Sequence, residues 1–307
     1  MRVVVVGTGV QGAKRIAAAG PDVVATVDPV AAGARYRQLD DVREEFDAAL
    51  LCVPDDAKLP LMLSLAQRGK HFLVEKPLVT IDDDNLRRLM KVAGDNGAVC
   101  YTAYNHRFEP HFVRMKALID SGALGRMYSA RLFYGNGTAR LVRQSAWRDQ
   151  GAGVLSDLGS HLLDTVHFWF GPPKTPFTLT AINRFENKSP DHAIAISTGE
   201  MTIELEMTML SWRNHFTCDI FAEKGSAHIE SLCKWGPTTF RHRTRVLPSG
   251  RPPEDSDTLV QDDPTWAAEY AHFKALCLAG GPGNLANDLW INSALRSLAA
   301  SDGGARS

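Results

Sequence analysis

A glycine-rich stretch near the amino terminus, Gly7-Thr8-Gly9-Val10-Gln11-Gly12, constrains the fold more than any other segment of this 307-residue chain. A continuous apolar run at residues 2–6 precedes it and is typical of a strand covered on both faces. Helix-forming residues 13–19 follow and end at Gly20-Pro21. Between a strand and a helix, glycines at this spacing permit a tight turn and let a pyrophosphate approach the backbone at the helix amino terminus. We therefore expect a dinucleotide to bind at Gly7, Gly9, Val10, Gln11 and Gly12.

A carboxylate after the second predicted strand bears on the choice of dinucleotide. Residues 23–27 form that strand and Asp28 ends it, about twenty residues beyond the glycines. There the carboxylate can accept hydrogen bonds from an adenosine ribose and repels a 2′-phosphate, so NAD is favoured and NADP is the alternative. Only about twenty residues remain before the next apolar strand. We therefore expect almost no helix after Asp28, a short edge strand at residues 35–39, a helical turn at 42–46, and a low wall near the adenine.

A second candidate site lies in Leu73-Val74-Glu75-Lys76-Pro77-Leu78, at the end of another buried strand. Strands predicted at residues 48–53, 70–74 and 98–102 complete a six-stranded sheet, and the first of these leads to Pro54. Doubly wound folds bind ligands at the carboxyl ends of their strands, so Lys76 is expected beside a ligand. Thr80 and Asp83 resemble a capping box for the next helix, and capping explains the acidic residues 82–84 better than a metal site does.

After residue 103 the pattern changes to consecutive strands. They are predicted at residues 127–134, 177–184, 193–197, 201–209, 216–221, 226–230 and 239–246, which indicates an open, largely antiparallel sheet. A helix at 110–121, a mobile loop at 248–264 and helices at 265–279 and 284–299 complete the second part. The predicted class is α/β: a Rossmann dinucleotide-binding domain at residues 1–103 and an α+β domain at 104–307, whose last helices are free to pack back on the first.

Three polar residues, Asp157, His161 and Asp164, are spaced to share one face of a predicted helix. Another side of that helix carries the apolar stripe Leu158, Leu162, Val166 and Trp169. A carboxylate one turn from an imidazole can orient the ring and keep it basic, as a general base near neutral pH requires. A histidine on a helix is more often structural, so both interpretations remain open at this point.

Composition narrows the function classes. Formal net charge is −1, so no basic surface argues for nucleic acid. No apolar run approaches the length that a bilayer requires, and neither a cleavage site nor a presequence is visible at the start. The five cysteines are scattered without a CxxC pair, which favours reduced thiols in a cytoplasmic protein. No histidine or cysteine cluster has the spacing of metal ligands, so we expect no metal.

Together, Gly7-x-Gly9-x-x-Gly12, Glu75-Lys76-Pro77 and Asp157-x-x-x-His161 resemble the glucose–fructose oxidoreductase/inositol dehydrogenase family, known as Gfo/Idh/MocA. The resemblance covers nearly the whole chain and implies an NAD(P)-dependent oxidoreductase that acts on a sugar, nucleotide sugar or cyclitol. It implies that Lys76 and His161 are catalytic, that Asp157 assists them, and that the Lys76–Pro77 peptide is cis. The chain departs from the family pattern at Gly151-Ala152-Gly153, where the family has three glycines, and in the nearly absent helix after Asp28.

The same resemblance implies the remaining site residues. Cofactor contacts would include Pro54, Glu75, Lys76, Trp147 and Arg148. Substrate contacts would come from Lys76, Asn105, Arg107, Arg148, Asp157 and His161.

The resemblance also implies assembly into a homodimer or homotetramer through the second sheet. An apolar set at Met201, Met207, Met209 and Trp212 fits an oligomer interface, and packing within one subunit explains it nearly as well. The alternative to an enzyme is a non-catalytic, NAD(P)-sensing regulatory protein on the same scaffold. Such a protein would have no need of a lysine and a histidine placed for proton transfer, so the enzyme is favoured.

Overall fold

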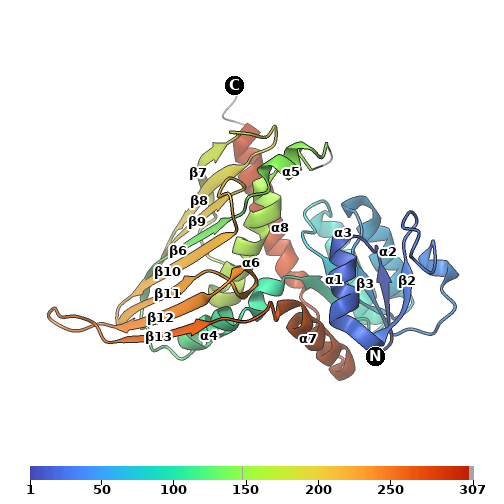
Figure 1. The fold of residues 1–307 in the computed structure, drawn as a ribbon, viewed down its shortest axis with the longest axis horizontal. Coiled ribbons are helices and arrows are strands. Elements are labelled where there is room, and N and C mark those ends of the chain that lie inside the picture. The colour runs from blue at the N-terminus through green and yellow to red at the C-terminus, as the bar shows by residue number, and fades with distance from the viewer. Residues whose placement is uncertain (147, 304–307) are drawn as a thin grey trace. The chain divides into compact units, whose positions relative to one another are not determined.

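The chain folds into two compact units (Figure 1). The computed structural model describes residues 1–146 and 148–303. The first unit contains Met1–Asn105 and Thr265–Trp290, and the second contains His106–Pro264 and the described residues from Ile291 onward. The division falls inside the last helix, α8 (Leu285–Gly303).

The first unit is built on a five-stranded parallel sheet in the order β2-β1-β3-β4-β5. Its strands are β1 (Val3–Val6), β2 (Val23–Val27), β3 (Ala48–Leu51), β4 (His71–Glu75) and β5 (Cys100–Ala103). The chain order reverses between β1 and β3, and the carboxyl ends of these two strands flank the point where doubly wound sheets bind their ligands.

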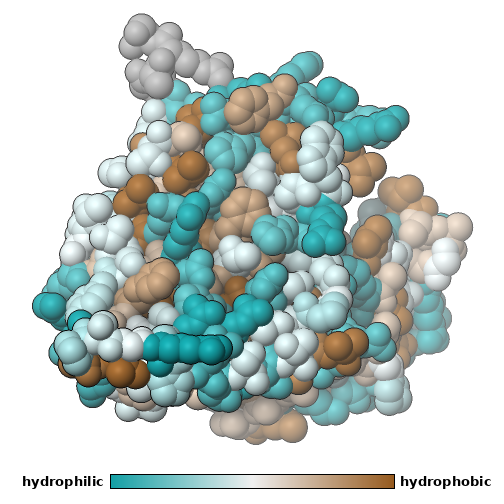
Figure 2. Space-filling view, turned by 60° about the vertical axis from the view of Figure 1, so that its left-hand side comes forward, coloured by the Kyte–Doolittle hydropathy of each residue, from teal (hydrophilic) through white to brown (hydrophobic). Residues whose placement is uncertain are grey.

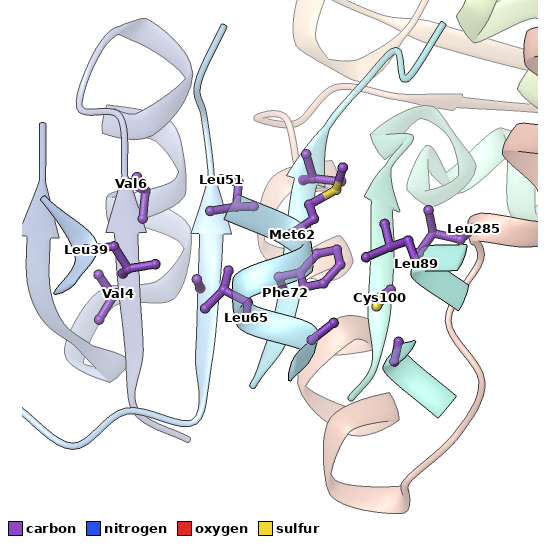
Figure 3. Close-up of a cluster of buried hydrophobic side chains, with 14 of the residues drawn as sticks. Val4, Val6, Leu39, Leu51, Met62, Leu65, Phe72, Leu89, Cys100 and Leu285 are labelled. Carbon is purple, nitrogen blue, oxygen red and sulfur yellow. The ribbon is translucent and has the colours of Figure 1, made fainter. Parts of the chain in front are cut away.

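Helices cover both faces of this sheet, which is why β1 and β3 are apolar throughout. The helices are α1 (Val10–Ala19), α2 (Asp55–Gln67), α3 (Asp83–Asp95) and α7 (Thr265–Ala279). On one face Val4, Leu51 and Phe72 pack with Met62 of α2 and Leu89 of α3 (Figure 3). On the other face the alternate residues of the same strands pack with Phe273 of α7. This burial fixes the strand ends that carry the candidate site.

The stretch between β2 and β3 differs from the prediction in part. No helix occurs between Val27 and Leu39, as expected, and a short 3₁₀ turn spans Leu39–Asp41. The predicted edge strand at residues 35–39 is wrong, because only Tyr36 pairs with the sheet, through a single bridge to Val27. The sheet therefore has five strands rather than six, and the helical turn predicted at 42–46 is absent.

The amino-terminal cap of α3 also differs from the prediction. Asp82, and not Thr80, is the capping residue, and its carboxylate accepts a hydrogen bond from the backbone N–H of Asn85. The capping box is therefore wrong in register, although the acidic residues do serve the helix start as expected.

The second unit is built on an eight-stranded sheet in the order β13-β12-β11-β10-β6-β9-β8-β7 (Figure 1). Its strands are β6 (Met127–Gly135), β7 (Thr178–Asn183), β8 (His192–Thr198), β9 (Thr202–Thr208), β10 (His215–Ala222), β11 (Gly225–Glu230), β12 (Thr238–Thr244) and β13 (Glu254–Leu259). Only the β6–β9 pairing is parallel among these described strands. The predicted α/β class, a parallel dinucleotide-binding sheet followed by an open, largely antiparallel one, is confirmed.

Helices pack on one face of the second sheet. They include α4 (Pro110–Asp120) and α6 (Ser160–Phe170), which contact each other, and α5 (Ala139–Arg143) follows β6. Burial alternates along β8, β9 and β10, so one face is core and the other is partly exposed. The surface turned toward the viewer in Figure 2 mixes hydrophilic and hydrophobic residues.

Two expectations for this unit need correction. The segment at 248–264 was expected to be a loop, yet it contains β13, which pairs with β12 along its length. Met207 and Met209 are buried within the subunit, so packing explains these two better than an exposed oligomer face, whereas Trp212 is 84% exposed. All five cysteines are free thiols.

Candidate functional site

The glycine loop has the shape that close approach of a dinucleotide requires. Gly7 has φ +85°, and a Cβ added there would lie 2.2 Å from the carbonyl oxygen of Cys52. A Cβ on Gly12 would lie 1.9 Å from the carbonyl oxygen of Gly7, whereas a Cβ on Gly9 would meet open space. Helix α1 begins at Val10, which is 76% exposed, and Gln11 is exposed beside it. Two glycines therefore set the turn, and the third leaves the helix amino terminus open to a phosphate.

The carboxylate of Asp28 accepts hydrogen bonds from four groups, two of which belong to Thr8 of this loop. Its Oδ2 accepts from the backbone N–H of Thr8 (2.8 Å) and from the Thr8 hydroxyl (3.1 Å). Its Oδ1 accepts from the backbone N–H groups of Val30 and Ala31, both at 2.9 Å. These bonds, that of the Thr8 N–H foremost, hold the pKa of Asp28 well below its ordinary value. A carboxylate has about four acceptor sites, so a ribose hydroxyl has to share or displace one of these donors.

Lys76 and its neighbours lie where β4 ends. Pro54 is exposed and caps the start of α2, and the Lys76–Pro77 peptide is cis as the resemblance implied. A residue without a predicted role, Lys58, fixes this segment: its ammonium donates to the carbonyl oxygen of Pro77 (2.9 Å) and pairs with Asp55 (2.7 Å). The side chain of Lys58 is buried, and a lysine on a helix start gave no signal of that contact.

Glu75 belongs to a buried ion cluster that spans three elements of the first unit. Arg15 on α1 donates to Glu75 (2.8 Å) and to Glu269 on α7 (2.6 Å), and all three side chains are largely shielded from water. The Arg15 guanidinium also lies 4.3 Å from the ring centroid of Trp266. Burial alone would lower the pKa of Arg15, but the charges of Glu269 and Glu75 raise it above its ordinary value. Arg15 is therefore a permanent cation that fixes the residue preceding Lys76.

Asn105 closes the first unit, at the end of β5. Its side-chain amide donates to the hydroxyl of Thr265, 2.7 Å away, at the first residue of α7. This bond fixes the amide group where the chain leaves the parallel sheet.

In the second unit, Arg107 is engaged with a buried carboxylate. Its guanidinium donates three hydrogen bonds to Asp164 of α6, the shortest being 2.6 Å, and lies over the ring of Phe168. Burial raises the pKa of Asp164, and the charge of Arg107 opposes that rise. The pair therefore connects Arg107 to α6, the helix that also carries His161.

His161 lies at the start of α6 in an aromatic setting. Its ring stacks on His106, with centroids 4.0 Å apart and planes within 16°, and meets the edge of Tyr134 from β6. Tyr134 in turn stacks on Trp235. None of His106, Tyr134 and Trp235 is among the predicted site residues, because their contacts join segments far apart in the chain.

Asp157 is one turn before His161, but not in α-helical geometry. It lies in a π-helical turn, Leu155–Gly159, that leads directly into α6, and its carboxylate is 3.8 Å from the guanidinium of Arg148. Burial first, and then the charge of Asp157, raise the pKa of Tyr134, whose ring is in contact with His161. The single helix face predicted for these residues needs correction for Asp157, because the π turn changes its spacing to His161, whereas His161 and Asp164 both lie in α6 and Asp164 is buried against Arg107.

The glycines before this turn permit a close approach between segments. Gly153 has φ +49°, and a Cβ added there would lie 2.2 Å from the carbonyl oxygen of Pro190. The middle residue of the motif, Ala152, replaces a family glycine and stands between the two that have positive φ. Trp147 lies outside the described residues.

Each unit thus gathers part of the predicted set. The first unit holds the glycine loop, Asp28, Pro54, Glu75, Lys76 and Asn105, and the second holds Arg107, Arg148, Asp157 and His161. Within residues 1–146 and 148–303, no group of three His, Cys, Asp or Glu side chains is arranged to hold a metal ion. In the same part of the chain, no helix is both long and apolar enough to cross a bilayer.

Comparison with known families agrees with this architecture. Residues 1–104 match the oxidoreductase family with an NAD-binding Rossmann fold, and residues 112–228 match the GFO/IDH/MocA C-terminal domain. The chain belongs to the GFO/IDH/MocA family. The family resemblance inferred from the three motifs is thereby confirmed, and the first unit of this family member is an NAD-binding Rossmann fold.

Individual relatives are more distant. Inositol 2-dehydrogenase of Rhizobium meliloti is 28% identical over 151 residues, which cover 48% of this chain and 44% of the relative. Levoglucosan dehydrogenase of Pseudarthrobacter phenanthrenivorans is 28% identical over 126 residues, which cover 39% of this chain and 32% of the relative. The matched stretches thus span less than half the length of these two curated relatives.

Solved structures resemble the whole chain. A putative NADPH-dependent oxidoreductase from Desulfitobacterium hafniense superposes with a TM-score of 0.85 at 16% identity, covering 100% of this chain and 96% of the other. A putative myo-inositol dehydrogenase from Sinorhizobium meliloti gives 0.79 at 20% identity, covering 100% and 98%. At these identities the likeness shows the fold alone.

Proposed function

We propose that this family member is an NAD(P)-dependent dehydrogenase or ketoreductase. It transfers a hydride between nicotinamide and a secondary alcohol or ketone of a sugar, nucleotide sugar or cyclitol. The observation that carries this proposal is the presence in one chain of an open glycine loop, Lys76 at the end of β4 and His161 at the start of α6. A cofactor sensor would need only the first of these. The inositol and levoglucosan dehydrogenases among its relatives support the substrate class.

The residues divide the chemistry between them. Bound NAD supplies the C4 carbon that accepts the hydride. His161 takes the proton that leaves the substrate hydroxyl, while Asp157 holds the imidazole and stabilises its charged form. Lys76 donates a hydrogen bond to the reacting oxygen, which stabilises the alkoxide as it develops. Asn105, Arg107 and Arg148 bind the substrate around this carbon, and in the reverse direction the same groups protonate a ketone.

Replacement of the two proton-transfer residues tests the proposal. We expect Lys76→Ala and His161→Ala each to lower the rate of the chemical step at least about a hundredfold, because each group acts in the transition state. NADH binding, followed by its fluorescence, stays near the wild-type value. The substrates are a panel of sugars, nucleotide sugars and inositols.

A matched control is Lys174→Ala, which removes an exposed lysine that pairs with exposed Glu200 and leaves the rate unchanged. Turnover that survives both catalytic substitutions contradicts the assignment. Tight NADH binding with no turnover across the panel instead supports the cofactor-sensing alternative.

Cofactor preference is a separate test. We expect NADH to bind more tightly than NADPH, because the carboxylate of Asp28 remains ionised beside the glycine loop and repels a 2′-phosphate. Asp28→Ala narrows the difference between the two dissociation constants. Thr8→Val removes one donor from Oδ2 while the backbone N–H bond stays, so it retains the preference for NADH. Tighter binding of NADPH to the wild type, with no change in Asp28→Ala, contradicts this assignment.

A further inference from the structure

Two imidazoles are stacked within the second unit, and only one of them has a role in the proposed reaction. His106 is 2% exposed and His161 is 9% exposed, and their rings are nearly parallel at 4.0 Å. Two positive charges at that distance, shielded from water, repel strongly. The pair therefore takes up one proton beyond its neutral state rather than two, and the surrounding charges determine which ring binds it.

The charge of Lys234 acts on one ring of the pair, His106. Its ammonium nitrogen lies 3.4 Å from Nε2 of His106. An ammonium has three donors and no acceptor, so Nε2 of His106 faces it as a lone pair and the ring proton is on Nδ1. The positive charge of Lys234 also opposes any further proton on His106. This contact describes a neutral His106 in the Nδ1–H tautomer.

The turn that carries Lys234 is firmly held, although it lies 128 residues from His106. It is the 3₁₀ turn Cys233–Trp235 between β11 and β12. The backbone N–H of Cys233 donates to Glu109 (3.0 Å), and the Trp235 ring stacks on Tyr134 at 5.6 Å. Lys234 is thus fixed by its neighbours on both sides rather than by its own contact alone.

Other charged or titratable groups face the pair from the surrounding elements. Burial raises the pKa of Glu109, which follows the turn that carries His106, and the charges of Asp263 and Lys234 act on it in opposite directions. Burial and then the charges of Asp157 and Glu109 raise the pKa of Tyr134, so its phenol stays neutral. Arg148 pairs with Asp157, with nitrogen and oxygen 3.8 Å apart. Among these groups, Lys234 is the cation that contacts an imidazole nitrogen of the pair, at 3.4 Å.

We propose that Lys234 is a positioning residue that keeps His106 neutral, so that the stacked pair takes up its single proton on His161. This inference rests on the proposed function, because it makes His161 the ring that receives the proton from the substrate hydroxyl. His106 then acts as a neutral platform whose π face lies against the imidazolium as it forms. Neither Lys234 nor His106 exchanges a proton with the substrate.

The first test reads the tautomer of His106 directly. In the full-length protein labelled with ¹⁵N-histidine, long-range ¹H–¹⁵N spectra show His106 as the neutral Nδ1–H form from about pH 5 to about pH 8. The resonances are assigned by their loss in His106→Phe. In Lys234→Met, His106 takes up a proton within that range. An Nε2–H tautomer or a cationic His106 in the wild type overturns the proposal.

The second test is kinetic and uses a double-mutant cycle. Lys234→Met shifts the acidic limb of the kcat/KM profile upward by about one pH unit, because the limb then reports protonation of His106, and a proton on His106 prevents His161 from taking a second one. Lys234→Arg keeps the cation and restores the wild-type profile. Lys174→Met, the exposed control, leaves the profile unchanged.

The background His106→Phe keeps a stacked ring but removes the acceptor nitrogen. In it, Lys234→Met has no further effect on the profile. An undiminished shift in that background means that Lys234 acts directly on His161, which overturns the route through His106. The tautomer measurement needs no substrate, so its result is independent of the proposed reaction. If His106 is the neutral Nδ1–H form but no substrate is turned over, the proposed function alone is contradicted.

Discussion

The two sheets of this protein place their polar groups in different ways. In the parallel sheet, β1, β3 and β5 are buried along their whole length, and the candidate residues lie where strands end. In the second sheet, burial alternates along β8, β9 and β10, and His161 lies on a helix packed over the buried face. A sheet covered on both faces leaves only its ends for a ligand, whereas a half-covered sheet builds a site from side chains of several elements.

The same contrast appears in how each unit uses buried charge. The first unit surrounds one cation, Arg15, with two carboxylates and an aromatic ring. The second unit pairs one carboxylate, Asp164, with one guanidinium. Removing the cation leaves more uncompensated charge in the first case, and the free energy of unfolding can measure the difference.

The largest effect is expected in the first unit. Arg15→Met leaves Glu75 and Glu269 without their common cation, so we expect the free energy of unfolding to fall by about 3–5 kcal/mol. Denaturant unfolding measures it. Arg2→Met, which breaks an exposed pair with Asp47, serves as the control and costs about 1 kcal/mol or less. Equal losses in the two variants would remove the distinction between the cluster and a surface pair.

A smaller, pH-dependent effect is expected in the second unit. Arg107→Met costs about 3 kcal/mol at neutral pH, because buried Asp164 loses its partner. The pKa of Asp164 is already raised by burial and rises further without Arg107. The folded state then binds more protons than the unfolded one, so stability falls as pH rises from the unfolded pKa through the folded one. Unfolding measured from about pH 4 to about pH 8 shows a loss that grows with pH, and a constant loss would contradict this assignment.

The smallest effect on folding is expected on the partly exposed face. Arg131→Met breaks contacts with Glu204 and Glu206, yet the Arg131 side chain is 62% exposed, so the free energy of unfolding falls by about 1 kcal/mol or less.

We propose that copies of the chain pair through this sheet into a dimer or tetramer. Arg131→Glu then lowers the oligomer population in sedimentation while the unfolding of each subunit changes little. An unchanged sedimentation profile would place the interface elsewhere.

Much of the fold could be predicted from local sequence. The strand Val23–Val27 and the helix Thr265–Ala279 occur at the predicted bounds, because apolar runs and helix periodicity report burial directly. The π turn at Leu155–Gly159 could not be predicted, since the spacing of Asp157 and His161 was interpreted with α-helical geometry. Nor could the roles suggested for Lys58, His106 and Lys234, because each depends on a contact between distant segments.

The hydrogen bonds from Thr8 to Asp28 have a consequence for nucleotide association. They join the glycine loop to the end of β2 through groups of the protein itself, so the loop has few conformations to lose when a nucleotide binds. We therefore expect the loop to lose little conformational entropy when a dinucleotide binds, which calorimetry of binding can measure. Protonation of Asp28 in acid would weaken these hydrogen bonds, make the loop more mobile and lower the association rate of the nucleotide.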